Sequence, residues 1–262
     1  MSKVLAIANQ KGGVGKTTTS VNLAASLKET RKRVLLIDMD PQGNATMGSG
    51  QDKAQLATSM YELLCGHAEF DQVVVGAEAG GYDLLPSNGD LVAAEIELMS
   101  LENREIRLRN IIERVRDRYD FIVIDCPPSL NMLTINALVA ADGVVIPMQC
   151  EYYALEGLSA LMETISAIQG TLNPSLRIEG ILRTMYDPRN KLTSEVNGQL
   201  FNYFGDAVYR TVVPRNVRLA EAPSFGKPVL KYDKQSRGAI AYLALAGELL
   251  RRHDEAAASM AG

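Results

Sequence analysis

The sequence has 262 residues, of which 47% are apolar and 22% charged, and its formal net charge is −4. These values are typical of a water-soluble globular protein with a core of its own, and they exclude a collagen-like, low-complexity or disulfide-stapled chain. Three scattered cysteines without a C-x-x-C pair, and only two histidines, argue against a disulfide framework and a zinc site and indicate a reducing, cytosolic setting.

Short apolar segments alternate with helical patterns along the chain. Predicted strands cover residues 3–8, 33–38, 82–86, 120–125, 143–149, 178–186 and 207–213. Predicted helices cover residues 16–29, 59–65, 90–98, 103–117, 130–141, 154–170, 192–204, 215–222 and 237–252. Several strands are apolar at successive positions, which is typical of parallel strands covered on both faces. The alternation predicts right-handed βαβ crossovers and an α/β fold with a doubly wound, mainly parallel sheet flanked by helices.

We expect a single domain over residues 1–262, because no linker, low-complexity tract or internal repeat interrupts this pattern. Residues 44–58 and 223–236 carry no clear pattern and stay unassigned. The small and acidic residues at 254–262 predict a flexible tail. The first residues are too short and wrongly flanked for a signal peptide, and no apolar run approaches the ~20 residues of a membrane span.

The segment that follows the first predicted strand, residues 8–20, has the sequence ANQKGGVGKTTTS. A strand, a glycine-rich loop and a helix in this order are typical of a P-loop, whose backbone N–H groups and helix N-terminus face phosphate oxygens. We expect Lys16 to reach the β- and γ-phosphates of a nucleotide, and Thr17 to place its hydroxyl on Mg²⁺. Gln10 stands where the general pattern has glycine, so a plain glycine turn is the alternative. The predicted nucleotide-binding residues of the loop are Lys11, Gly12, Gly13, Val14, Gly15, Lys16, Thr17 and Thr18.

Three aspartates follow predicted buried strands. Asp38 and Asp40 end the segment VLLIDMD, and Asp125 ends the segment FIVID. Ligands of open α/β sheets bind at the carboxyl ends of the strands, so we expect these side chains beside the loop. Asp125 has the position of a Walker-B carboxylate that holds Mg²⁺ through water, and Asp38 is expected to support the same ion. Asp40 suits the orientation of the attacking water. A cap of a turn or helix is the alternative role for each.

The motifs KGGVGKTT, DMDPQGNAT and DCPPSLNMLTINAL together resemble the deviant Walker A ATPases. That branch of the P-loop fold also includes MinD, the nitrogenase iron protein and the arsenite-pump ATPases. The segments QCEYYALEGLSAL, TMYDPRN and VVPRNVRLAEAPSFGKP resemble the ParA and Soj partitioning ATPases specifically, and the resemblance extends from residue 3 to about residue 250. Since the P-loop strand begins at Lys3, the resemblance is to the short form without an N-terminal helix-turn-helix.

The resemblance implies a role for the second lysine of the loop. Lys11 matches the signature lysine of this family, which reaches across an ATP-dependent homodimer to the phosphates bound by the other subunit. A second cation there would stabilise phosphate charge that one lysine and Mg²⁺ leave over. Solvation of Lys11, or action within its own chain, is the alternative. The expected catalytic residues are Lys11, Lys16 and Asp40, and hydrolysis without a partner is expected to be slow.

Four positions in the C-terminal third of the chain match the family's residues that lie against adenine. They are Met185, Pro214, Arg215 and Asn216. A proline turn before a helix is the alternative for the last three, and a purely structural role is equally open for Met185. The iron–sulfur relatives need cysteines from two subunits around a cluster. Cys126 lies in the DCPPS stretch, where ParA relatives also carry a cysteine, and a buried, inert thiol is the better interpretation.

Residues 207–237 hold seven basic side chains against two acidic ones, on a chain of net charge −4. Such a local excess suits binding to the DNA backbone without reading of bases, although charge runs also occur as plain solvated surface. The resemblance implies that ATP-bound dimers bind nonspecific double-stranded DNA, which would place the protein on the nucleoid in the cytoplasm. The residues expected to bind DNA are Arg189, Arg218, Lys227, Lys231 and Arg237.

The resemblance therefore implies a DNA-partitioning ATPase that uses ATP and Mg²⁺. A ParB-type centromere-binding protein would stimulate hydrolysis and release the dimer from DNA, which drives chromosome or plasmid segregation. One alternative is a ParA-like positioner of a protein cargo, and another is a non-hydrolysing, nucleotide-dependent scaffold. Residues 239–250 are apolar nearly all round the predicted helix, so we expect no membrane anchor of the MinD kind.

Overall fold

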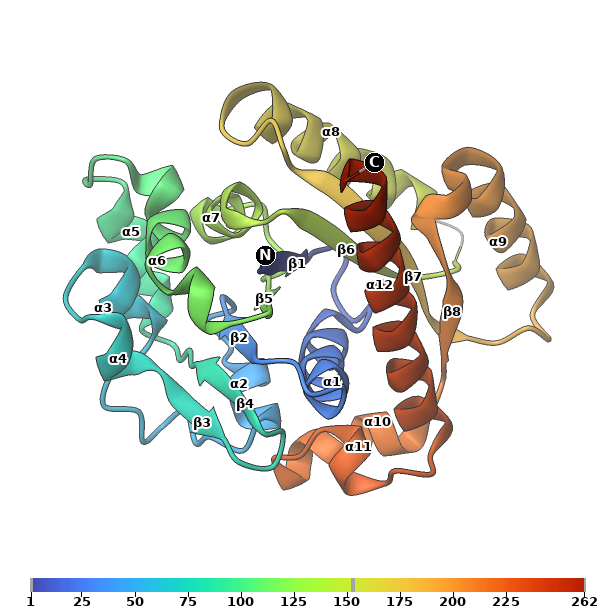
Figure 1. Cartoon of the computed structure of the whole chain (residues 1–262), viewed down its shortest axis with the longest axis horizontal. Helices are drawn as coiled ribbons and strands as arrows, with labels where there is room; N and C mark the ends of the chain where they lie inside the picture. The colour runs from blue at the N-terminus through green and yellow to red at the C-terminus, as the bar shows by residue number, and fades with distance from the viewer. Residues whose placement is uncertain (1, 152–153, 262) are drawn as a thin grey trace.

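The computed structural model of the chain describes residues 2–151 and 154–261. Eight strands in this part of the chain form one sheet in the order β3-β4-β2-β5-β1-β6-β7-β8, which lies between two layers of helices (Figure 1). The strands are β1 (Lys3–Ile7), β2 (Val34–Asp38), β3 (Val75–Ala77), β4 (Tyr82–Leu85), β5 (Phe121–Asp125), β6 (Gly143–Gln149), β7 (Arg177–Tyr186) and β8 (Val208–Pro214). Every neighbouring pair is parallel except β3 and β4. The predicted doubly wound, mainly parallel sheet is confirmed.

Helices cover both faces of the sheet. On one face, α1 (Lys16–Glu29) packs beside the long α12 (Arg237–Ala261). The shorter α2 (Asn44–Gly48), α10 (Val217–Glu221) and α11 (Val229–Tyr232) lie near their ends. The other face carries α3 (Met60–Cys65), α4 (Phe70–Val73), α5 (Leu91–Leu98), α6 (Arg107–Val115), α7 (Met132–Ala140), α8 (Ala154–Thr171) and α9 (Lys191–Phe204).

The central strands supply both hydrophobic cores. Val4 and Ala6 of β1 belong to the core under α7, whereas Leu5 and Ile7 belong to the core under α1. Successive side chains of a strand point to opposite faces, so a strand with a core on each side must be apolar at every position. This requirement explains the unbroken apolar runs in the sequence.

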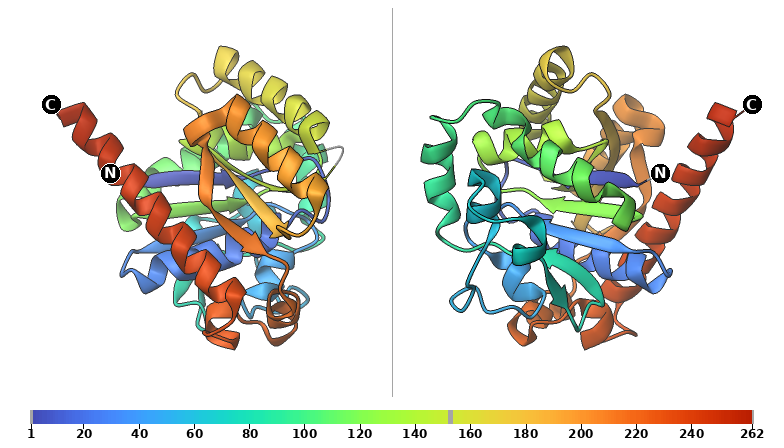
Figure 2. Two further views of the ribbon diagram at one scale, coloured as in Figure 1. Left: turned by 90° about the vertical axis from the view of Figure 1, so that its right-hand side faces the viewer. Right: turned by 60° about the vertical axis from the view of Figure 1, so that its left-hand side comes forward.

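The structure departs from the predicted elements in a few places. The edge strand β3 was not predicted, and at three residues it is too short to carry a clear pattern. Helices α2 and α11 lie in the two segments that the sequence left unassigned. The predicted helix over 237–252 continues to Ala261, so residues 254–261 of the predicted tail are helical. In Figure 2 this end of α12 projects beyond the rest of the chain.

Candidate active site

Three central strands end side by side beneath the glycine-rich loop. Asp125 at the end of β5 is in register with Asp38 of β2 and with Ile7 of β1. Both carboxyl groups are fully buried. Burial raises the pKa of Asp38, and burial followed by the nearby Asp38 carboxylate raises the pKa of Asp125. The fold thus concentrates buried negative charge beside the loop, where a bound cation would relieve it.

The N-terminal part of α1 holds the Asp125 carboxylate. The Thr17 hydroxyl donates to Asp125 Oδ2 at 2.8 Å, and the Ser20 hydroxyl donates to Asp125 Oδ1 at 2.8 Å. Gly15, just before the helix, has φ +87°, a left-handed conformation that favours glycine. Ser20 was not among the predicted site residues, although its spacing of three from Thr17 places the two hydroxyls on one face of a helix.

Lys16 is a buried cation at the helix start, with 7% of its surface exposed. Its Nζ donates to the main-chain carbonyl of Lys11 at 3.1 Å. Burial lowers the pKa of Lys16, while Asp125 and Asp40 favour its charged form. The ammonium group therefore lies inside the curve of the loop, near Asp125, which Thr17 also contacts.

Asp38 and Asp40 organise the loop that follows β2. Asp38 Oδ2 accepts hydrogen bonds from the Thr46 N–H at 2.8 Å and the Thr46 hydroxyl at 2.7 Å, and Asp38 Oδ1 accepts from the Asp40 N–H at 3.1 Å. Asp40 Oδ1 accepts from the Gln42 N–H at 2.9 Å, and the Asp40 main-chain carbonyl accepts from the Ser87 hydroxyl at 2.9 Å. Both aspartates thus have the turn-holding contacts that were the alternative to a functional role.

Two adjoining cavities bring most of the predicted site together. The first, of about 390 Å³, is lined by Gly12, Gly13, Gly15, Lys16, Thr17, Thr18, Asp40, Gln42, Asn44, Pro128 and Met185. The second, of about 220 Å³, is lined by Gly15, Thr18, Thr184, Met185, Val213, Pro214, Arg215, Asn216, Leu219, Ala220 and Tyr242. Gly15, Thr18 and Met185 line both, so the two cavities adjoin each other beside the loop. Thr184, which sequence reasoning missed, fixes the loop through its hydroxyl, 2.8 Å from the Val14 carbonyl oxygen.

Lys11 lies outside the residues that line either cavity. Its Nζ forms an ion pair with Glu151 Oε2 at 2.7 Å, with 40% of the Lys11 side chain and 52% of the Glu151 side chain exposed. Sequence reasoning missed Glu151, which stands in the motif QCEYYALEGL. In the single chain, the two lysines of the loop therefore have different surroundings.

The predicted adenine-side residues lie on the wall of the second cavity. Met185 has φ +48°, an uncommon conformation for a residue with a Cβ atom, and its Sδ accepts a contact from the Gln149 amide. Asn216 caps α10, because its side-chain oxygen accepts from the Arg218 N–H at 3.2 Å. The predicted turn before a helix is therefore present, and the same turn forms part of the cavity wall.

Four of the five predicted DNA-binding residues are exposed and lie between α10 and the start of α12, whereas Arg189 lies apart from them, after β7. Arg218 pairs with Glu221 at 2.7 Å and with Asp233 at 3.3 Å, and Lys231 pairs with Glu29 at 3.1 Å. Arg189 pairs with Asp187 at 2.7 Å. In the described ranges, Lys227 and Arg237 have no carboxylate within 4.0 Å. Glu29 belongs to α1 and was not part of the charge count over residues 207–237. The net positive charge of this surface is therefore smaller than that count suggests.

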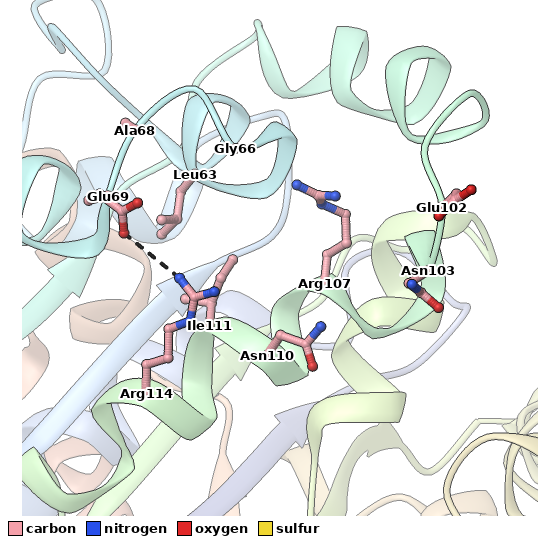
Figure 3. A pocket seen from close by; sticks show the side chains of 10 residues that line it. All are labelled: Leu63, Gly66, Ala68, Glu69, Glu102, Asn103, Arg107, Asn110, Ile111 and Arg114. Atoms are coloured by element: carbon pink, nitrogen blue, oxygen red, sulfur yellow. Dashed lines mark ion pairs between the residues drawn. The ribbon is translucent and has the colours of Figure 1, made fainter.

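Two further features do not join this site. Cys126 is 1% exposed and burial raises the pKa of its thiol, which fits the predicted inert role. A cavity of about 340 Å³ lies away from the loop, between α3–α4 and α6, where Arg114 faces Glu69 with 3.9 Å between Nη1 and Oε2 (Figure 3). None of the predicted site residues lines that cavity.

Across the described ranges, no helix combines the length and apolar character that crossing a bilayer requires.

Comparison with known proteins places the chain in a family. A family model described as an AAA domain, AAA_31, matches residues 2–178. The sporulation initiation inhibitor protein Soj of Bacillus subtilis is 54% identical over 249 residues, 95% of this chain and 98% of Soj. The chromosome partitioning protein ParA of Caulobacter vibrioides is 51% identical over 261 residues, 99% of this chain and 98% of ParA.

A solved structure extends the comparison to three dimensions. The structure named cobyrinic acid a,c-diamide synthase from Mycobacterium smegmatis, with bound ADP and magnesium, has a TM-score of 0.86 and 38% identity, and the match covers 97% of this chain and 96% of that one. Its name describes a different reaction, but the partitioning proteins share more identity with this chain over nearly its whole length. The chain belongs to the ParA and Soj family of chromosome-partitioning ATPases.

Proposed function

We propose that this chain is an ATP-dependent DNA-partitioning ATPase whose ATP-bound dimer binds nonspecific double-stranded DNA on the nucleoid. A ParB-type partner stimulates hydrolysis and releases the dimer, and repetition of this cycle segregates chromosomes or plasmids. The observation that carries the proposal is the pair of adjoining cavities beside the glycine-rich loop, the first lined by Lys16 and Thr17 and the second by Pro214 and Asn216. An elongated molecule with phosphates at one end and a flat base at the other fits this shape.

The triphosphate of ATP would lie in the first cavity. Loop N–H groups and the N-terminus of α1 offer partial positive charge to phosphate oxygens, and the buried Lys16 ammonium adds a full charge. The base would lie in the second cavity against Met185, Pro214, Arg215 and Asn216. The support for this orientation is that Gly15 and Thr18 line both cavities.

The residues beside the loop fit Mg²⁺. The Thr17 hydroxyl and the Asp125 carboxylate are hard oxygen donors only 2.8 Å apart, and the two fully buried carboxylates gain from a nearby cation. Thr17 would bind the ion directly, and Asp125 would hold it through water. Asp38, whose oxygens already accept hydrogen bonds from Thr46 and Asp40, would act on the ion through water. Bound Mg²⁺ offsets charge that develops on the β- and γ-phosphate oxygens.

Asp40 is our candidate for orienting the attacking water. It lines the first cavity together with Lys16, and the Ser87 and Gln42 contacts fix its main chain and one carboxylate oxygen. A carboxylate held in this way can accept a hydrogen bond from a water molecule placed in line with the γ-phosphate. Lys16, together with Lys11 of a second subunit, would stabilise charge on the transferred phosphoryl group.

Dimer formation would depend on ATP through Lys11. The partly exposed ammonium of Lys11 pairs with Glu151 on the protein surface, and exchange of this pair would make it available to the phosphates of a second subunit. ADP has no γ-phosphate and would hold the dimer less well, which couples nucleotide state to assembly. Two copies of the exposed basic segment then act together on one DNA molecule, and the affinity rises through the effective concentration of the second copy.

The test is DNA binding measured with ADP, ATP and a slowly hydrolysed ATP analogue over a series of salt concentrations. We expect tight binding to a duplex of arbitrary sequence with ATP and the analogue, weak binding with ADP, and a steep loss of affinity as salt rises. Equal binding in all three nucleotide states contradicts the proposal. Nucleotide-dependent binding whose release no ParB-type protein affects supports the protein-cargo alternative instead.

A further inference from the structure

A second cluster of chemically reactive side chains lies apart from the nucleotide cavities, where the end of α3 meets α5. The sulfur of Cys65, a ring nitrogen of His67 and a carboxylate oxygen of Glu97 all lie within 4.8 Å of one another. Cys65 is the last residue of α3, and Glu97 is next to last in α5. Two sequence-distant helices thus converge on one small space with three different metal-binding groups.

The backbone turn between Cys65 and His67 creates the cluster. Gly66 caps α3 with φ +85°, a left-handed conformation that ends the helix and turns the chain back. The His67 N–H then donates to the Glu62 carbonyl oxygen at 2.8 Å, which fixes the start of the next segment. As a result, His67 Nε2 lies 2.7 Å from Glu97 Oε1.

We propose that Cys65, His67 and Glu97 form a binding site for a single Zn²⁺ ion, with water in the fourth position. Zinc bonds to sulfur, nitrogen and oxygen are about 2.0–2.3 Å long, so ligand atoms in a tetrahedron stand roughly 3.3–3.8 Å apart. The ligand atoms already lie within 4.8 Å, and small side-chain rotations bring them to that spacing. A thiolate, a carboxylate and a neutral imidazole together balance the two positive charges of the ion.

The surroundings of the cluster are those of a supported metal site. The Tyr61 hydroxyl donates to Glu97 Oε2 at 2.9 Å and orients the carboxylate. Hydrogen bonds to ligand side chains have this orienting role in metal sites. Cys65 is only 7% exposed, whereas 51% of the His67 side chain is exposed and leaves a path from solvent. The other charged groups near the thiol, Arg107 and Glu62, have opposite signs. When the ion binds, the thiol loses its proton to solvent and the Zn–S bond replaces the S–H bond.

The expectation from the sequence was different, because no C-x-x-C pair is present and the chain has only two histidines. That expectation rests on the spacings of zinc fingers. Here the third ligand comes from a helix 30 residues further along the chain. The bound ion would join α3 to α5 and stabilise the folded chain by mass action.

Cobalt titration of the full chain, without a histidine tag and stripped of metal, tests the site. Excess Mg²⁺ is kept in solution so that the nucleotide site does not take up cobalt. We expect one equivalent of Co²⁺ per chain to produce a thiolate-to-cobalt charge-transfer band and tetrahedral visible bands, and Zn²⁺ to abolish both. Cys65→Ser and His67→Gln should remove the thiolate band, and Tyr61→Phe should weaken Co²⁺ binding roughly ten- to hundredfold.

Matched controls come from the chain itself. Cys150→Ser and His253→Gln alter a buried cysteine and a histidine elsewhere, and both should keep the full cobalt spectrum. ATP hydrolysis, measured with Mg²⁺, should not change in His67→Gln. Because the His67 side chain is half exposed, this variant should also fold normally. The absence of a thiolate band in the wild type, or an unchanged band in His67→Gln, would overturn the proposal and leave the cluster a hydrogen-bonded contact between two helices.

Discussion

The ammonium group of Lys11 lies 2.7 Å from Glu151 Oε2, so the second lysine of the loop is engaged within its own chain. Both side chains are about half exposed, and ion pairs of this kind contribute about 0–1 kcal/mol. The phosphates of ATP in a second subunit carry more charge than one carboxylate. The pair is therefore weak enough to be exchanged for phosphate contacts when a dimer forms.

Removal of the Glu151 charge should favour the dimer. In Glu151→Gln, Lys11 no longer gives up an ion pair when it reaches a second subunit, so we expect ATP-dependent dimerisation to strengthen by up to about fivefold per exchanged pair. Analytical ultracentrifugation with an ATP analogue measures this change. Glu195→Gln, which alters a carboxylate 3.9 Å from Lys191 on α9, is the matched control. Weaker dimerisation of Glu151→Gln would show that Glu151 itself contacts the other subunit.

Replacement of Asp40 should separate ATP binding from hydrolysis. Asp40→Ala leaves Lys16 and Thr17 in place but removes the carboxylate proposed to orient water. We expect at least a hundredfold loss of partner-stimulated hydrolysis with ATP binding retained, so that the dimer stays on DNA. Phosphate release and DNA retention are the two measurements, and Asp206→Ala, at a fully exposed carboxylate, serves as control. Unchanged turnover with the partner present would favour the non-hydrolysing scaffold.

Lys227 offers a cleaner test of the DNA surface than Arg218. Arg218→Glu would also break ion pairs with Glu221 and Asp233, whereas Lys227 has no such partner in the described part of the chain. We expect Lys227→Glu to weaken DNA binding with ATP, and to reduce the slope of log affinity against log salt by about one per lost phosphate contact. Lys191→Glu on α9 makes the same charge change elsewhere. Equal DNA affinity of the two variants would remove Lys227 from the proposed surface.

The Glu248 carboxylate should stabilise the junction of β8 and α12. It accepts from the main-chain N–H of Arg210 at 2.7 Å and of Thr211 at 2.9 Å, and from Arg252 Nη2 at 2.8 Å. We expect Glu248→Gln to lower the free energy of unfolding by about 2–3 kcal/mol, because an amide cannot satisfy these donors. Urea unfolding at neutral pH measures the change. Glu255→Gln, at an exposed site on the same helix, should change stability by less than about 0.5 kcal/mol.

The same carboxylate predicts a pH dependence. Burial opposes the charge of Glu248, but hydrogen bonds from Thr211 and Arg210 outweigh it and hold the pKa of Glu248 below its ordinary value. A lowered folded-state pKa gives stability that is present above the ordinary glutamate pKa and is lost as the pH falls through the folded-state value. The stability difference between wild type and Glu248→Gln should therefore shrink on acidification. A constant difference from pH 7 down to pH 3 would contradict this assignment.

The sequence predicted those parts of the fold whose residue pattern has a single physical cause. A strand buried on both faces must be apolar throughout, so β1, β2 and β5 were recognisable, and with them the positions of Asp38 and Asp125 at the strand ends. The glycine-rich loop has a pattern of its own. Short elements such as β3 and α11 carry too few residues for a periodicity, and their conformation depends on the packing around them.

Contacts between distant segments could not be predicted. Glu151 and Lys11 are 140 residues apart, and Glu29 and Lys231 are 202 apart, and neither pairing leaves a mark in either local sequence. The two segments left unassigned, 44–58 and 223–236, also contact each other. The backbones at Gly50 and Gly226 approach so closely that neither position leaves room for a Cβ atom. Each glycine has a positive φ, so both the turn and the close approach require it.

The most direct measurement of the proposed mechanism is sedimentation of wild type and Lys11→Ala with ADP and with a slowly hydrolysed ATP analogue. If Lys11 makes ATP a link between subunits, the wild type forms a dimer only with the analogue. Lys11→Ala then stays a monomer although it still binds nucleotide through Lys16 and Thr17. An unchanged, analogue-dependent dimer of Lys11→Ala would contradict the cross-subunit role of this lysine.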